Sequence, residues 1–440
     1  MKTISKKHLI PFVLVTVCFA LWGFANDITN PMVKAFSKIF RMSVTDGALV
    51  QLAFYGGYFC MALPAALFIR KFSYKAGLLM GLGLYAVGAF MFLPAQAIGS
   101  YYPFLLAYFV LTCGLSFLET SANPYVLSMG DSETATRRLN LAQAFNPIGS
   151  LAGMFVAMNF IQSRLNPMDS AARAQLSEVD FEAVKTSDLA VLSKPYVLIG
   201  VVLVVMFLFF IFFLPKQSKT DVVEDNVLAE GDKSFKATIK RLWSNKCYRY
   251  GVIAQFFYVG VQIMCWTFII QYGTRVFMNE GLGEQAAEVL AQKYNIVAML
   301  IFCVSRFVCT FLMKYVKPHR LLATLGVVGF VLIGCVILGD GRFGMGCLVA
   351  VSACMSLMFP TIYGISLQGI GEDAKLGAAG LIMAILGGSV LPPLQALIID
   401  GDGLGNISSV NLSFVLPMLC FVVIVVYAVS IPSLSRKKIC

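Results

Sequence analysis

The feature that most constrains this chain is an unbroken apolar run at residues 197–214, VLIGVVLVVMFLFFIFFL. The run contains no charged residue, and its side chains do not alternate between polar and apolar as in a membrane β-barrel strand. A helix needs about 20 apolar residues to cross the hydrocarbon core of a bilayer. Because lipid offers no hydrogen-bond partners to an open strand, the run predicts a membrane-spanning helix.

Eleven further apolar segments of similar length accompany this run. The twelve predicted spans cover approximately residues 9–37, 46–69, 76–96, 101–128, 138–162, 195–214, 249–276, 290–313, 319–339, 343–369, 375–399 and 409–432. Only 13% of all residues are charged, about half of the usual share in a soluble protein. A soluble globular fold is therefore excluded, and we predict an all-α integral membrane protein with twelve transmembrane helices.

The positive net charge of +11 is explained by membrane orientation rather than by binding to nucleic acid. If both termini lie in the cytoplasm, 23 of the 34 lysines and arginines fall at cytoplasmic ends of the predicted spans and ten at the opposite ends, while Arg306 falls inside a span. This asymmetry is the positive-inside bias. The twelve cysteines are scattered without a CxxC pair, so we expect neither a disulfide framework nor a metal site.

The spans divide around a central charged segment. We predict an N-terminal six-helix half at residues 1–215, a cytoplasmic linker at 216–247 and a C-terminal six-helix half at 248–440. The linker is expected to contain a short amphipathic helix at about 235–243. The two halves show weak internal similarity, because a proline in the fourth and tenth spans (Pro124, Pro360) precedes glycines in the next span (Gly149; Gly387 and Gly388). Repeats of this kind are typical of secondary transporters with a central substrate site.

Two acids lie deep inside predicted spans. Asp27 is roughly 27 Å, and Glu119 roughly 15 Å, from the cytoplasmic end of its helix at 1.5 Å per residue. Ionisable groups at such depths are costly and usually mark a transport pathway. A carboxyl in a partly dry cavity can bind and release a proton near neutral pH, because desolvation disfavours its charged form. A purely structural pairing with a cation is the alternative, but Arg306 is the only basic residue near the interior of a span and cannot neutralise both acids.

Neutral hydrogen-bonding side chains also lie inside the predicted spans. Asn123 is one turn from Glu119. The other candidates are Gln143 and Asn146 in the fifth span, and Gln255, Tyr258, Gln262 and Trp266 in the seventh. Each could simply form interhelical hydrogen bonds. Together, amides, carboxylates and aromatic rings suit a neutral polyol, whereas an anionic substrate would require lysine or arginine in the cavity.

The sequence resembles the fucose–galactose–glucose branch of the major facilitator superfamily over nearly its whole length. The motifs that carry the resemblance are LW…NDI, FLETSANPYV, RLNLAQAFN, AQFFYVGVQIMCW, FPTIYGISLQGIG and MAILGG. The resemblance implies the twelve-helix fold of that superfamily, alternating access and proton-coupled uptake of a monosaccharide across a bacterial inner membrane. L-fucose is the expected cargo, and glucose, galactose or N-acetylglucosamine are the alternatives.

The resemblance also implies roles for individual residues. Asp27 matches the proton-carrying acid of the NDI motif, and Glu119 matches an acid that takes part in sugar recognition and coupling. Gln143 and Asn146 match the amides of a QxxN pair. Asn26, beside Asp27, and Tyr363, in the FPTIYG motif, are further substrate-binding candidates.

Other classes of function fit the sequence less well. An enzyme would need a catalytic or metal-ligand grouping, and the predicted loops contain none. A sensor would need a soluble output domain. A drug/proton antiporter would need a more apolar cavity lining. The expected partners are a monosaccharide, protons and the lipid bilayer, and the protein is expected to act as a monomer without a cofactor.

Overall fold

The computed structural model describes residues 9–29, 32–42, 46, 49–166, 168, 170–214, 235–339, 341–399, 401, 403–405 and 407–436. These residues are almost entirely helical, and their only β pairing is an isolated bridge between Leu404 and Ile407. Twelve helical segments are long and apolar enough to cross a membrane. The predicted all-α membrane fold with twelve spans is therefore confirmed.

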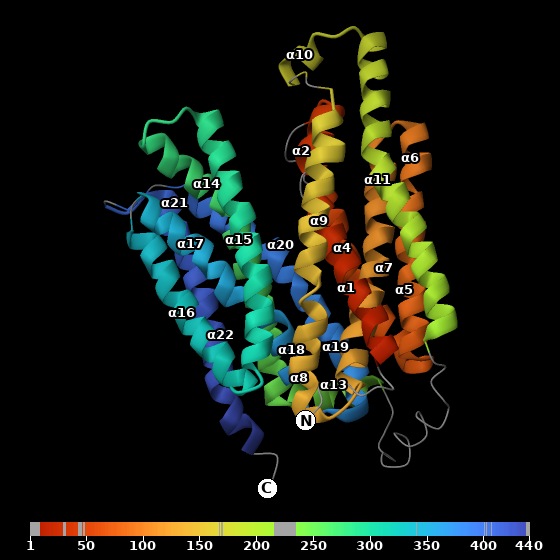
Figure 1. Cartoon of the computed structure of the whole chain (residues 1–440), viewed down its shortest axis with the longest axis vertical. Helices are drawn as coiled ribbons and strands as arrows, with labels where there is room; N and C mark the ends of the chain where they lie inside the picture. The colour runs from red at the N-terminus through yellow and green to blue at the C-terminus, as the bar shows by residue number, and fades with distance from the viewer. Residues whose placement is uncertain are drawn as a thin grey trace. The chain divides into compact units, whose positions relative to one another are not determined.

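The first six spans (Figure 1) are α1 (Leu9–Thr29), α4 (Leu49–Lys71), α5 with α6 (Tyr74–Phe90, Phe92–Ile98), α7 (Tyr101–Ser128), α8 with α9 (Ala135–Gln143, Asn146–Val156) and α11 (Glu178–Phe213). The last six are α14 (Lys246–Asn279), α15 (Glu284–Leu312), α16 (Pro318–Leu338), α17 with α18 (Gly341–Met355, Met358–Leu367), α19 with α20 (Ala374–Met383, Gly387–Ile399) and α21 with α22 (Ser409–Ser413, Val415–Arg436). Short helices α2 (Met32–Ile39), α10 (Ser170–Ala174) and α13 (Phe235–Ser244) lie between spans. The predicted amphipathic helix of the linker is α13, whereas residues 216–234 lie outside the described part of the chain.

The helices form two compact units, which we describe separately. The N-terminal unit comprises Ser5–Val126 and Phe145–Gly231, and the C-terminal unit comprises Met1–Ile4, Leu127–Ala144 and Asp232–Cys440. The chain thus passes from one unit to the other between α8 and α9, inside the fifth span. Within the C-terminal unit, α8 packs against α15 and α18.

Glycines bring α1 and α9 of the N-terminal unit into backbone contact. A Cβ atom added to Gly149 would lie 1.7 Å from the carbonyl oxygen of Ala20, and one added to Gly23 would lie 2.0 Å from that of Asn146. No side chain fits at either position. Small residues at such crossings allow close van der Waals packing, which is the main attraction between helices in lipid.

The C-terminal unit repeats this packing between α14 and the eleventh span. A Cβ atom on Gly387, the first residue of α20, would lie 2.0 Å from the carbonyl oxygen of Phe256 in α14. The similarity between the Gly149 and Gly387 regions in the sequence therefore has a physical cause. In each unit, a glycine marks the place where two spans touch through their backbones.

The sixth span begins far earlier than predicted. The sequence places its start near residue 195, but α11 begins at Glu178 and contains 36 residues. Its length is about 54 Å at 1.5 Å per residue, well beyond the roughly 30 Å of a hydrocarbon core. The helix starts in polar sequence because the side chain of Ser177 accepts a hydrogen bond from the backbone N–H of Asp180 and so caps its first turn.

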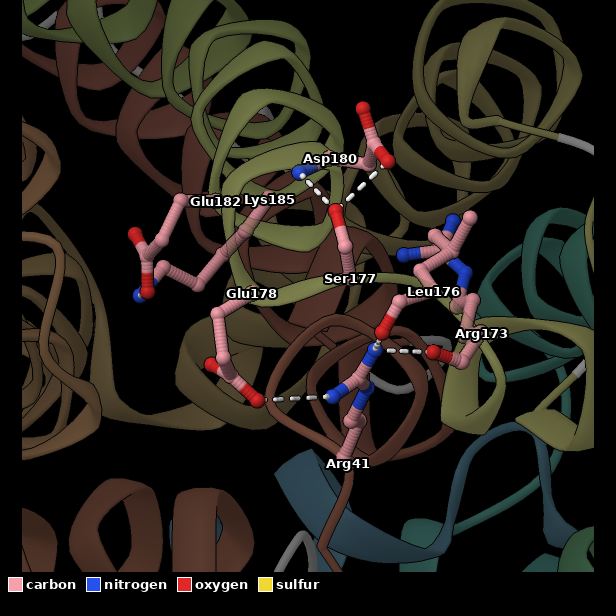
Figure 2. Close-up of polar contacts among 8 residues, drawn as sticks. All are labelled: Arg41, Arg173, Leu176, Ser177, Glu178, Asp180, Glu182 and Lys185. Carbon is pink, nitrogen blue, oxygen red and sulfur yellow. Dashed lines mark hydrogen bonds and ion pairs between the residues drawn. The ribbon is translucent and has the colours of Figure 1, made fainter.

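Polar contacts hold this extended start of α11 against α2 and α10. Figure 2 shows the guanidinium of Arg41, which lies just after α2, pointing to the carbonyl oxygens of Arg173 and Leu176 and to the carboxylate of Glu178. The same guanidinium stacks over the ring of Phe181, 3.6 Å from its centroid. The Arg41 guanidinium therefore connects the segment that follows α1 with the start of the sixth span.

Candidate functional site

Glu119 and Asn123 lie one turn apart on α7, and both are buried in the N-terminal unit. The Glu119 side chain is 5% exposed, and within the described part of the chain its Oε2 atom has no hydrogen-bond partner. An unsatisfied carboxyl oxygen in the membrane interior is costly. It can be retained where a proton or a substrate hydroxyl supplies the missing hydrogen bond.

Asp27 and Asn26 are half-buried near the end of α1, where α4 contributes two tyrosines. Tyr55 interacts electrostatically with Asp27, and Tyr58 interacts with Glu119. The hydroxyl of Tyr58 also accepts a 2.6 Å hydrogen bond from Nε1 of Trp22. Each tyrosine of α4 therefore lies within electrostatic range of one of the two acids.

Tyr55 and Tyr58 were missed by the sequence analysis. Their signal is two tyrosines at i and i+3 in the otherwise apolar segment QLAFYGGYF, which puts both hydroxyls on one face of the second span. The signal is weak, because tyrosine is also common in buried helices for its apolar ring. Only the tertiary packing shows that this face meets Asp27 and Glu119.

Gln143 and Asn146 lie on either side of the break in the fifth span. Gln143 is the last residue of α8 and is buried in the C-terminal unit, whereas Asn146 begins α9 in the N-terminal unit. The amide of Asn146 donates a 3.1 Å hydrogen bond to the carbonyl oxygen of Phe19 in α1. The three-residue spacing of these amides thus spans a helix break rather than one continuous helix face.

The candidate residues of the seventh span differ in whether their polar atoms already form hydrogen bonds within the protein. Gln255 is fully buried, and neither of its amide atoms has a hydrogen-bond partner among the described residues. In contrast, the hydroxyl of Tyr258 donates to the carbonyl oxygen of Met355 at 3.1 Å, and Nε1 of Trp266 donates to Ser352 at 3.2 Å. Gln262 is half-buried, and Tyr363 on α18 is fully buried. Gln255 is therefore the candidate with the most hydrogen-bonding capacity to offer a ligand.

Arg306 is a buried cation of the C-terminal unit to which the sequence analysis gave no role. Its guanidinium donates hydrogen bonds to the main-chain carbonyls of Ser356 and Gln143, and it lies 4.6 Å from the ring centroid of Phe302. No carboxylate of the described residues lies within ion-pair distance of it. The signal in the sequence was that Arg306 is the single basic residue in the interior of a span.

The candidate side chains are carboxyls, amides and aromatic rings. The two candidate carboxyls lie in the N-terminal unit, whereas candidate amides are present in both units. Among the described residues no group of His, Cys, Asp and Glu could hold a metal ion. Amides and carboxyls can bind hydroxyl groups in both directions, as donors and as acceptors.

A family model, related sequences and a solved structure all match this chain over most of its length. The sequence matches the Major Facilitator Superfamily over residues 15–393. It is 51% identical to the L-fucose-proton symporter of Haemophilus influenzae over 97% of each chain. It is 30% identical to the glucose/galactose transporter of Brucella abortus, over 96% of this chain and 94% of the relative. The crystal structure of the Escherichia coli fucose:proton symporter FucP matches with a TM-score of 0.83 and 31% identity, over 96% of this chain and 98% of that one.

Proposed function

The chain belongs to the Major Facilitator Superfamily, and from this premise we propose that it is a proton-coupled symporter that imports L-fucose by alternating access. The observation that carries the proposal is the 51% identity to a curated L-fucose-proton symporter across 97% of both chains. The identity to a glucose/galactose transporter is only 30%. L-fucose is therefore the first candidate, and glucose, galactose and N-acetylglucosamine are the alternatives.

Coupling to protons is assigned to Asp27 and Glu119. In this proposal Asp27 takes up a proton from the outer side before sugar binds, and Glu119 helps to release it inward. A proton moving down the membrane potential supplies about 2.3 kcal/mol per 100 mV, whereas tenfold accumulation of a neutral solute costs about 1.4 kcal/mol. One proton per sugar is thus sufficient to drive uptake.

Recognition of the sugar is assigned to buried and half-buried amides and aromatic rings. The proposed set is Asn26, Asn123, Gln143, Asn146, Gln255, Tyr258, Gln262, Trp266 and Tyr363. Gln255 is supported most strongly, because both of its buried amide atoms lack partners in the described chain. Tyr258 and Trp266 already donate to protein acceptors. We therefore assign their rings, rather than their donors, to contact with the apolar face of a sugar.

We also propose the arrangement of this transporter in the cell. It resides in a bacterial inner membrane as a monomer, with both termini in the cytoplasm, in agreement with the positive-inside count. Two six-helix halves, residues 1–215 and 248–440, would alternate access to a central site. The segment at 216–247 would act as their cytoplasmic linker.

Addition of sugar to lightly buffered cells that express the protein tests the function. A symporter removes protons from the medium, so L-fucose should cause a transient alkalinisation, which glucose, galactose and N-acetylglucosamine should cause less strongly or not at all. A protonophore abolishes the signal if it reports coupled transport. Acidification instead of alkalinisation would indicate a proton antiporter, and a stronger response to another sugar would replace L-fucose as the cargo.

A further inference from the structure

The fifth and tenth spans are each interrupted near a proline, and at each interruption one main-chain carbonyl lacks the usual i+4 donor of an α-helix. In an α-helix the carbonyl of residue i accepts from the N–H of residue i+4. The residue four positions after Gln143 is Pro147, and the residue four positions after Ser356 is Pro360. Proline has no N–H, so neither carbonyl can accept the usual i+4 hydrogen bond.

The structure shows which group replaces these donors. The guanidinium of Arg306, on α15, donates to the carbonyl oxygen of Gln143 at 2.9 Å and, through its Nε atom, to that of Ser356. The two carbonyls that lose a partner to proline are thus both hydrogen-bonded by one side chain. Unsatisfied backbone groups are costly in the membrane interior, and a planar guanidinium can serve two acceptors at once.

The charge of Arg306 is suited to this position. Both carbonyls lie at helix C-termini, because α8 ends at Gln143 and α17 ends at Met355. Helix C-termini carry partial negative charge and favour a nearby cation. The ring of Phe302, whose centroid is 4.6 Å from the guanidinium carbon, adds a cation–π contact. These interactions explain how a cation that is only 3% exposed is retained without a carboxylate partner among the described residues.

Some of the residues assigned to sugar recognition lie next to these two breaks. Gln143 carries one of the capped carbonyls, and Tyr363 lies on α18, the helix that starts after the second break. Tyr258 reinforces this second break, since its hydroxyl donates to the carbonyl oxygen of Met355. The orientation of two candidate sugar-binding residues, Gln143 and Tyr363, therefore depends on the hydrogen bonds that stabilise the two helix breaks.

We propose that Arg306 is a positioning residue: its guanidinium replaces the amide donors that Pro147 and Pro360 lack, and thereby fixes Gln143 and Tyr363 for substrate binding. The replacement of the amide donors concerns the protein alone, whereas the positioning of Gln143 and Tyr363 for substrate rests on the proposed sugar transport. The two parts of the proposal therefore predict separate results, one in thermal stability and one in the KM for sugar.

Rescue by restored amide groups tests the proposal. Arg306→Gln in the full-length protein should lower the Tm measured in detergent and raise the KM for uptake into proteoliposomes by about tenfold or more, because small displacements of binding groups have effects of this size. Adding Pro147→Ala and Pro360→Ala to this variant returns an N–H to each helix. The triple variant should recover most of the lost Tm and most of the KM.

A matched control uses a proline that Arg306 does not serve. Pro124 lies inside α7, and Pro124→Ala should leave the defects of Arg306→Gln unchanged. Arg306→Lys should give an intermediate Tm, since an ammonium lacks the planar fork that reaches two carbonyls. If Arg306→Gln does not fold, the proposal requires that the triple variant does.

Three outcomes would overturn the proposal. An unchanged Tm in Arg306→Gln would show that the two carbonyls do not need the guanidinium. A triple variant that recovers neither Tm nor KM would show that proline is not the cause of the dependence. Recovery of Tm without recovery of KM would mean that Arg306 contacts the substrate directly. Absence of sugar transport in the unmodified protein would instead refute the proposed function. The Tm comparison would still test whether the Arg306 guanidinium replaces the missing amide donors.

Discussion

Nε1 of Trp22 donates a 2.6 Å hydrogen bond to the hydroxyl of Tyr58, which links α1 to α4 in the interior of the N-terminal unit. The two spans carry Asp27 and Tyr55 about one turn further from this contact. The indole and the phenol are both buried, so each polar atom satisfies the other. The relative position of the first and second spans, and with it the surroundings of Asp27 and Glu119, depends on this pair.

Tyr58→Phe should destabilise the protein by about 1–3 kcal/mol, because it leaves the Trp22 N–H buried without its acceptor. The Tm in detergent measures this effect. Tyr102→Phe is the matched control, since Tyr102 is 74% exposed and the same change should leave the Tm nearly constant. Equal Tm values for both variants would contradict a structural role for the Trp22–Tyr58 bond.

Asp27→Asn should abolish accumulation of sugar against its gradient, because an amide cannot carry a proton through the transport cycle. Exchange of labelled for unlabelled sugar, which needs no net proton movement, should persist at least in part. Glu119→Gln should weaken both processes, because Glu119 is also assigned to sugar recognition. Uptake in vesicles with an imposed pH gradient, compared with counterflow, separates the two roles. Accumulation by Asp27→Asn would remove this residue from the coupling mechanism.

Gln255→Leu should shift affinity and stability in opposite directions. The change removes two buried polar atoms that have no partners in the described chain, so the free energy of unfolding should stay constant or rise by about 1–3 kcal/mol. The KM for sugar should rise, because a hydrogen-bonding ligand group is lost. Gln395→Leu serves as the comparison. Only Oε1 of Gln395 lacks a partner among the described residues, since Nε2 donates to Ser413 at 3.1 Å. Leucine at this position should therefore raise stability less than at Gln255 and should leave the KM unchanged.

Asp188→Ala should strongly destabilise the start of the sixth span. Asp188 is 1% exposed and forms a 2.5 Å ion pair with the fully buried Arg173. Removing one partner of a buried pair typically costs about 3–5 kcal/mol, because the other charge remains desolvated. Glu182→Gln breaks the exposed pair with Lys185 and should cost at most about 1 kcal/mol. Similar Tm losses in both variants would argue against burial as the cause.

Gly149→Val should prevent stable folding, because even its Cβ atom would overlap the carbonyl oxygen of Ala20. Gly346→Ala offers a contrast within another helix. No atom lies within 4 Å of a Cβ at that position, so alanine should be tolerated and should favour the helix by up to about 1 kcal/mol. The amount of monodisperse protein after solubilisation reports both effects. Normal yield from Gly149→Val would contradict the close contact between α1 and α9.

Sequence reasoning placed most spans within a few residues of their observed ends, because hydrocarbon thickness sets the length of an apolar helix directly. It failed at α11, where residues 178–194 mix charged and apolar side chains and no continuous apolar run marks their helix. That segment is held by the Ser177 cap and by contacts of Arg41 and Arg173 with residues distant in the chain. Hydropathy records the part of a helix in lipid and does not detect an extension stabilised by tertiary contacts.

The class of this protein, its twelve spans and the presence of Asp27, Glu119 and Arg306 inside them follow from the amino-acid sequence, because placing charged residues in lipid is costly. The groups that these residues contact follow from the packing of the helices. Tyr58 accompanies Glu119, Gln255 is left without partners in the described chain, and Arg306 reaches carbonyls 163 and 50 residues away along the chain. Hydrogen bonds between distant residues depend on the three-dimensional packing of helices, and that packing leaves no local pattern to read.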